Sequence, residues 1–164
     1  MDTRSKEQRS WNMSHIKSQD TLPELIVRSL LHRNGYRFRL HVKELPGKPD
    51  IVLPKYRTVI EVRGCFWHYH QNCPNAKIPE TRHNWWQKKI QRNVQRDNVT
   101  VKALITAGWR VFVIWGCLLK SISKAKKECL FSFLLSSFQQ FCASNNNYCE
   151  IGSETFTNFL VEDK

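Results

Sequence analysis

Residues whose types can bind metals or transfer protons gather between positions 50 and 73. Asp50 and Glu61 lie on either side of the segment PKYR (54–57), and RGCFWHYHQNC (63–73) adds two cysteines, two histidines and three aromatic residues. Carboxylates, thiolates and imidazoles are the side chains that bind divalent metals and move protons. Three interpretations of the second stretch are open: a metal clip, a piece of hydrophobic core, or an active-site loop.

The two acids can be brought together by a β-hairpin. If PKYR is its turn, Asp50 lies opposite Glu61, and like charges at opposed positions, with Cβ atoms ~4.5–5.5 Å apart, are destabilising. A Mg²⁺ ion bound by both carboxylates offsets that repulsion. Arg63 points to the same face as Glu61 and can stabilise phosphate charge. The alternative is a surface Asp50 and a Glu61 paired with Arg63. The intervening pairs are Leu53 with Thr58, Val52 with Val59, and Ile51 with Ile60.

Four residues form a candidate zinc site. Cys65, His70 and Cys73 fall within nine residues, and Cys117 follows the apolar run WRVFVIWG. Zinc favours sets of four Cys and His ligands, and this set would attach the 63–73 loop to a strand end. The alternative is a group of unrelated buried thiols and a surface histidine.

The elements that position these residues follow from local patterns. Thr21, with Glu24 as capping-box partner, begins a helix that Gly35 ends. Its expected apolar stripe is Leu22, Leu25, Ile26, Ser29 and Leu30. Residues 36–42 alternate as in a strand, 84–108 form one long helix or two short ones, and 109–116 form a buried central strand. Residues 126–142 form a core helix, with Leu130, Leu134, Phe138 and Phe141 inward.

Charge and composition narrow the class. The 164 residues carry a formal net charge of +12, which predicts attraction to polyanions, nucleic acid first and a membrane surface second. No apolar run approaches the ~20 residues of a membrane span, and no signal peptide is seen, so we expect a cytoplasmic, nucleoid-associated protein with reduced thiols. Residues 1–20 form a basic arm, and residues 21–164 form a single domain.

Three segments in order resemble the very short patch repair (Vsr) endonucleases: LPGKPDIVLPKYRTVIEVRGCFWHYHQNC, TRHNWWQKKIQRNVQRD and GWRVFVIWGC. The resemblance runs from about Asn12 to Cys117. It implies an α/β fold like that of restriction endonucleases, a mixed sheet flanked by helices with a structural zinc. It also implies a nick on the 5′ side of the thymine in a T·G mismatch, a double-stranded DNA substrate, a MutL-type repair partner and a monomer.

The resemblance assigns roles by position. Asp50 and the carbonyl of Val62 match Mg²⁺ contacts, His68 matches a catalytic histidine, and Glu24 matches an acid near the site, beside its capping role. The four matching zinc ligands are Cys65, His70, Cys73 and Cys117. Phe66, Trp67 and Met13 match side chains that wedge between base pairs, a use that a weakened mismatched step favours. The expected DNA contacts are Met13, Phe66, Trp67, Trp86, Lys88, Lys89, Arg92 and Arg96; for the basic four, an ordinary solvated face is the alternative.

The chain departs from the best-known family members at Glu61-Val62-Arg63, which replaces Phe-Thr-His. Glu61 restores the acid of the wider PD-(D/E)xK nuclease pattern, with Arg63 in the lysine position. The sequence therefore predicts a Mg²⁺-dependent endonuclease in which Asp50 and Glu61 hold the metal, His68 assists proton transfer and Arg63 steadies phosphate charge. The alternatives are a restriction-type nuclease that cuts intact duplex and a non-catalytic, zinc-stabilised DNA-binding module.

Overall fold

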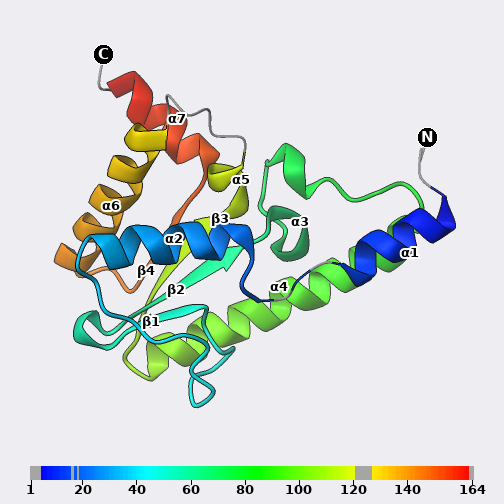
Figure 1. The fold of residues 1–164 in the computed structure, drawn as a ribbon. Coiled ribbons are helices and arrows are strands. Elements are labelled where there is room, and N and C mark those ends of the chain that lie inside the picture. The colour runs from blue at the N-terminus through cyan, green and yellow to red at the C-terminus, as the bar shows by residue number, and fades with distance from the viewer. Residues whose placement is uncertain (1–4, 16, 18, 121–126, 163–164) are drawn as a thin grey trace.

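A mixed four-stranded sheet forms the centre of the computed structural model, which describes residues 5–15, 17, 19–120 and 127–162. The strands lie in the order β1-β2-β3-β4; β1 pairs antiparallel with β2, and β2, β3 and β4 run parallel (Figure 1). Their bounds are Ile51–Leu53 for β1, Thr58–Arg63 for β2, Arg110–Trp115 for β3 and Tyr148–Ile151 for β4. The predicted mixed sheet with a buried central strand at 109–116 is confirmed.

The β1–β2 hairpin has the predicted register. Ile51 pairs with Ile60, and Leu53 pairs with Thr58. Its turn is a 3₁₀ segment, η1 (Pro54–Tyr56), followed by Arg57 in the left-handed conformation at φ 49°. Beyond the last strand pair, a side-chain contact joins the two segments: the Val62 amide donates a hydrogen bond of 2.8 Å to Asp50 Oδ2.

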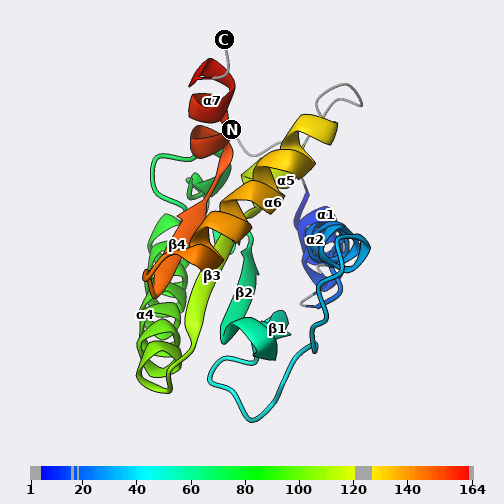
Figure 2. The same ribbon diagram turned by 90° about the vertical axis from the view of Figure 1, so that its left-hand side faces the viewer.

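Helices cover both faces of the sheet (Figure 2). On one face lie α2 (Leu22–Arg33) and α6 (Lys127–Ala143), with α7 (Ser153–Glu162) against α6; on the other lies α4 (His83–Thr106). Side chains alternate along β2, so that Ile60 enters the α2/α6 core and Val59 the α4 core. Glu61 and Arg63 follow Val59 at even spacing and therefore face the α4 side.

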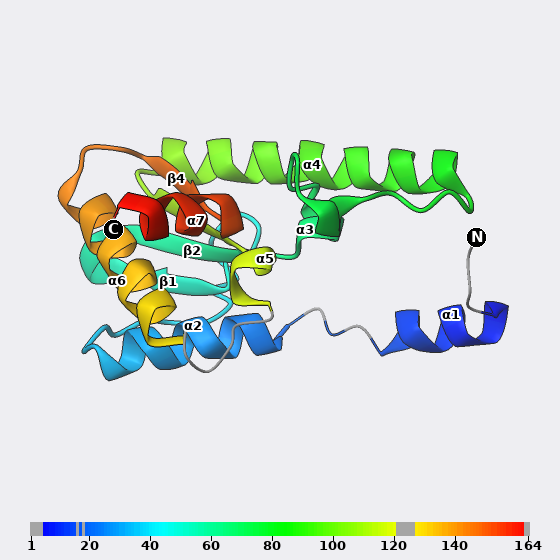
Figure 3. The same cartoon turned by 90° about the horizontal axis from the view of Figure 1, so that it is seen from above.

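Short elements carry the loop and the N-terminal segment. The 63–73 loop contains α3 (Cys65–His68), η2 (Pro74–Ala76) follows it, and α5 (Gly116–Leu119) begins at the end of β3. The N-terminal helix α1 (Lys6–Ser14) lies beyond the layers of the sheet and its covering helices (Figure 3). Residues 1–4, 16 and 18 of the predicted arm lie outside the described part of the chain. Among the described helices, none is both long and apolar enough to cross a membrane.

One local prediction was wrong in part and another wholly. On α2, Leu30 is buried and Ile26 packs against the core as predicted, but Leu22 and Leu25 are 70% and 48% exposed, Ser29 is exposed, and the buried face instead contains Val27 and Leu31. Turning that face inward also buries Glu24 and Arg28, which periodicity of apolar residues cannot anticipate. Residues 36–42 form no strand; they make one isolated bridge, between Arg39 and Val52. The three-residue β1 offers little edge, and the positive φ of His41 (47°) ends the extended run. By contrast, the segment predicted as one long helix or two short ones forms one helix, α4, and the predicted inward residues of α6 are buried.

Candidate active site and metal centre

A cleft of about 750 Å³ opens where the start of α2, the end of β2, α3 and α4 meet. It is lined by every residue predicted to be catalytic or to bind Mg²⁺: Glu24, Asp50, Glu61, Val62, Arg63 and His68. Residues from four separate elements therefore converge on one surface. The hairpin brings in the acids, and the turn of α3 directly after β2 brings in His68.

Asp50 is the acid most affected by its surroundings. Burial, together with the charges of Glu24 and Glu61, raises the pKa of its carboxyl to about 6, although the hydrogen bond from the Val62 amide lowers it. The two acids thus lie close enough to repel each other, as the hairpin register predicted. A pair of neighbouring acids in a cleft is a surface suited to a divalent cation.

Glu61 is not a free ligand in this arrangement. Arg63 Nε and one terminal nitrogen donate to Glu61 Oε2 at 2.8 and 2.5 Å. The structure thus combines features of the two alternatives: Asp50 and Glu61 lie close together, as the hairpin predicted, and Glu61 pairs with Arg63, as in the alternative, but Asp50 is half-buried and not a surface residue. Burial works against the charge of the guanidinium, but the charge and hydrogen bonds of Glu61 hold the pKa of Arg63 above its ordinary value. A permanent cation is thus fixed in the wall of the cleft.

His68 is oriented by a residue that the sequence reasoning missed. Its Nδ1 lies 2.5 Å from Asp97 Oδ2, a carboxylate on α4. Burial would raise the pKa of Asp97, but the hydrogen bond and charge of His68 lower it below its usual value. The signal was present but weak: Asn93, Asp97 and Thr100 recur at helical spacing and all line the cleft. Asn93 also fixes α3, by donating to the carbonyl of Trp67 at 2.9 Å.

The predicted zinc ligands form a single cluster. One ligand atom from each of Cys65, His70, Cys73 and Cys117 lies within 4.8 Å of the others, so this site could hold a metal ion. His70 Nδ1 faces Cys117 Sγ at 3.4 Å, and a hydrogen bond from Cys65 lowers the pKa of the Cys117 thiol. Three sulfurs and one imidazole nitrogen match the donor set of structural zinc sites.

The second nitrogen of His70 is held by the C-terminal part of the chain. His70 Nε2 lies 3.1 Å from Glu154 Oε1 on α7, and the imidazole stacks on Trp115 with centroids 4.2 Å apart. No pattern in the sequence points to Glu154, because its place depends on β4 and α7, neither of which was predicted. A carboxylate on the second nitrogen fixes the tautomer and direction of a metal-binding histidine.

The predicted DNA contacts divide into three groups. Phe66, Trp67 and Trp86 are half-buried and pack edge-on, with centroids 5.1 to 5.9 Å apart. Lys89 and Arg96 line the cleft, whereas Lys88 and Arg92 are exposed on other faces of α4. Met13 is 44% exposed on α1, away from the cleft lining. Of the aromatic group, Trp67 lines the cleft and packs against Phe66 and Trp86, whereas Met13 does not line the cleft.

Comparison with known proteins adds independent information. A family model described as DNA mismatch endonuclease Vsr matches residues 1–74. The Type II nicking enzyme V.XorIIP of Xanthomonas oryzae pv. oryzae is 49% identical over 121 residues, which cover 74% of this chain and 88% of that protein. DNA mismatch endonuclease Vsr of Escherichia coli K12 is 43% identical over 129 residues, covering 79% and 82%. Type II nicking enzyme V.HpaIIP of Haemophilus parainfluenzae is 32% identical over 117 residues, covering 71% and 83%.

The mixed α/β fold, the cleft that brings Asp50, Glu61 and His68 together, and these relatives together define a DNA endonuclease. The chain belongs to the Vsr family.

Proposed function

We propose that this endonuclease uses Mg²⁺ to nick one strand of double-stranded DNA on the 5′ side of the thymine in a T·G mismatch. The observation that carries the proposal is the half-buried Asp50 carboxyl, which shares one cleft with Glu61 and with a histidine held by an aspartate. The printed names of the relatives, which include a mismatch endonuclease and nicking enzymes, support the nick and the mismatch.

The metal would be held by Asp50, Glu61 and the backbone carbonyl of Val62. The fit rests on charge: Glu24 and Glu61 raise the pKa of Asp50, which indicates a site where a cation is favourable. When bound, Mg²⁺ would supply Lewis-acid polarisation of the scissile phosphate. The chain's own cation, Arg63, would stabilise the phosphate charge beside it, and its pairing with Glu61 keeps the guanidinium in place.

His68 would move the proton. Because Nδ1 is engaged by Asp97, the imidazole presents Nε2 to the cleft chemistry, either to accept a proton from the attacking water or to orient that water. Asp97 would stabilise the imidazolium that results. Glu24, on the opposite wall, would act through its charge on Asp50.

The rest of the molecule would serve DNA binding. A zinc ion on Cys65, His70, Cys73 and Cys117 would fix α3, so that Phe66 and Trp67 meet the DNA without an ordering cost. Lys88, Lys89, Arg92 and Arg96 would contact phosphates, and Met13 would reach the duplex from a basic arm, residues 1–20, on a restriction-endonuclease-like domain, residues 21–164. We also propose a cytoplasmic monomer that works with a MutL-type partner.

The test is a panel of duplexes with T·G, other mismatched and fully paired centres, incubated in Mg²⁺, with each strand mapped separately. The proposal expects a cut in the thymine-bearing strand of the T·G duplex at least tenfold faster than in the paired control. Equal cutting of both duplexes would replace mismatch repair with a restriction-type activity. Binding without any cut in Mg²⁺ or Mn²⁺ would leave only a DNA-binding module.

A further inference from the structure

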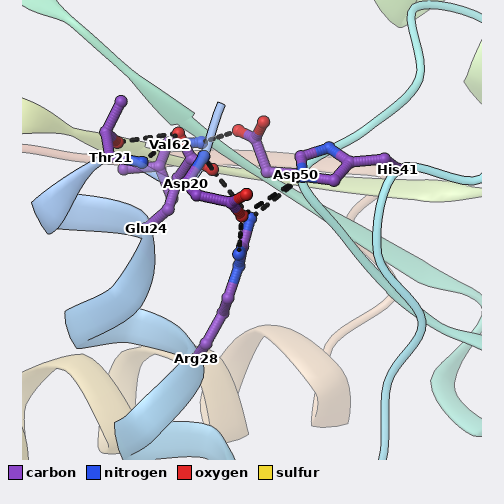
Figure 4. Close-up of polar contacts among 7 residues, drawn as sticks. All are labelled: Asp20, Thr21, Glu24, Arg28, His41, Asp50 and Val62. Atoms are coloured by element: carbon purple, nitrogen blue, oxygen red, sulfur yellow. Dashed lines mark hydrogen bonds and ion pairs between the residues drawn. The ribbon is translucent and has the colours of Figure 1, made fainter. Parts of the chain in front are cut away.

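One buried cation beside the cleft is unused by the mechanism above. Arg28, on α2, is only 8% exposed and is not among the residues that line the cleft. Its terminal nitrogens instead bridge two carboxylates: one donates to Asp20 Oδ1 at 2.5 Å and the other to Glu24 Oε2 at 2.7 Å (Figure 4). The nitrogen that contacts Glu24 also lies 3.2 Å from His41 Nε2.

The position of the Arg28 guanidinium is set by the contacts of its two terminal nitrogens. Among the described residues, Arg28 Nε is the one buried side-chain nitrogen or oxygen without a hydrogen-bond partner. An unsatisfied buried donor costs free energy. The contacts of the guanidinium with Asp20 and Glu24 must offset that cost, and they fix its position. Two carboxylates bridged by one planar fork is an arrangement that a lysine ammonium, a single point charge, does not reproduce.

The two bridged acids belong to different parts of the molecule. Asp20 ends the connection from α1 to α2, is 62% exposed in its side chain and has a positive φ of 53°. Glu24 lies in the cleft wall, where Asp20 N, Thr21 N and Thr21 Oγ1 also donate to its carboxylate. Lys17 and Gln19, in the same connection, line the cleft. Two residues just before Asp20 therefore line the cleft, and Asp20 itself is held by the Arg28 bridge.

We propose that Arg28 is a positioning residue that couples the N-terminal segment to the active site, because its guanidinium locks Asp20, where that segment joins α2, against Glu24 in the cleft. The coupling rests on the proposed catalytic use of the cleft. By binding Asp20, Arg28 orients the N-terminal segment for contact with DNA. By binding Glu24, it fixes the position of a carboxylate whose charge raises the pKa of Asp50.

The test separates binding from the chemical step. Single-turnover nicking of a T·G duplex, with protein in excess, gives a maximal rate constant and a half-saturating protein concentration. Arg28→Lys should lower the maximal rate about 10- to 100-fold, the cost of a small misplacement in an active site, and raise the half-saturating concentration severalfold. Asp20→Asn should raise that concentration alone, and Glu24→Gln should lower the maximal rate alone. Arg33→Lys, an exposed Arg on the same helix that donates to Ser29 O, is the matched control and should change neither.

The double variant Asp20→Asn/Arg28→Lys decides whether the two residues act together. If they do, its half-saturating concentration equals that of Arg28→Lys alone, whereas a product of the two single effects overturns the coupling. An Arg28→Lys protein with both parent constants also overturns it. Anisotropy of labelled duplex without Mg²⁺ measures the same binding shifts, so a chain that fails to nick removes the proposed function while the coupling is still decided. If Arg28→Lys fails to fold, Asp20→Asn alone decides: unchanged half-saturation overturns the proposal.

Discussion

The cleft and the Cys/His cluster take alternate residues of one short loop, 63–73, yet they are stabilised differently. In the cleft, charges already have protein partners: Glu61 has Arg63, Asp97 has His68, and Glu24 has Arg28. In the cluster, four ligand atoms face one another within 4.8 Å. The cleft can therefore form from the chain alone, whereas the cluster is suited to an ion that joins its members. We expect substitutions in the cluster to lower stability, and substitutions in the cleft to slow catalysis without lowering stability.

The largest effect on stability should follow from Cys117→Ser. A structural zinc contributes directly to folding, so we expect the protein to lose zinc and its unfolding midpoint to fall by on the order of 10 °C or more. Metal content by mass spectrometry and thermal unfolding measure both. Cys129→Ser, at a half-buried thiol on α6 outside the cluster, is the control. Equal midpoints for the two variants would contradict the difference between the regions.

A large effect on catalysis, with little on stability, should follow from His68→Asn. Removing the proton-transfer group should slow single-turnover nicking about 10²- to 10³-fold. Asp97→Asn, which removes the acid that orients His68, should give a smaller loss, and the double variant should lose little more than His68→Asn. His32→Asn, exposed at the end of α2, should nick at the parent rate. Additive losses at positions 68 and 97 would show that they do not act as a pair.

Asp50→Asn should make the metal-free protein more stable. Because burial raises the Asp50 pKa from 3.8 to about 6, ionisation of this acid opposes folding. The protonated carboxyl stabilises the folded state relative to the ionised one. This contribution to the free energy of unfolding is fully present below about pH 3.8 and is lost as the pH rises through about 6. At pH 7 the amide should therefore raise the free energy of unfolding by ~1–3 kcal/mol, and below pH 4 by nothing measurable. Urea unfolding without added Mg²⁺ measures this, with the exposed Glu44→Gln as control. A loss of stability at pH 7 would refute the electrostatic account.

The smallest effect should come from the partner of the cluster. Glu154→Gln leaves all four ligands in place but weakens the hold on His70 Nε2, and changes at such partners cost about 10- to 100-fold in metal affinity. Competition with a zinc chelator measures this directly, with Glu128→Gln on α6 as the control. Unchanged zinc affinity would mean that α7 only covers the site.

Local chemistry accounts for what the sequence could predict. The hairpin register follows from one turn and a two-residue alternation, and it alone brought Asp50 to Glu61. The spacing of Cys65, His70 and Cys73 gave three of the four residues of the Cys/His cluster. These features depend on residues close together in the chain, or on a donor set that few other functions use.

Non-local contacts account for what it could not predict. The pairing of His68 with Asp97 spans 29 positions, and that of His70 with Glu154 spans 84. Strand β4 has only four residues and two of them are exposed, so its place beside β3 is fixed by the sheet and not by its own pattern. The burial of Arg28 was missed for a local reason. Its helix was predicted, but the inner face of that helix was located from the spacing of apolar residues, and a buried charge does not follow that spacing.

The most direct test of the central claim compares wild type and Asp50→Asn in single-turnover nicking of a T·G duplex over a range of Mg²⁺ concentrations. The account predicts that wild type nicks only with a divalent cation. It also predicts that Asp50→Asn is slower by ~10³-fold or more, while duplex binding without metal changes by less than severalfold. Nicking by wild type in a chelator of divalent cations, or an Asp50→Asn protein as fast as wild type, would contradict it.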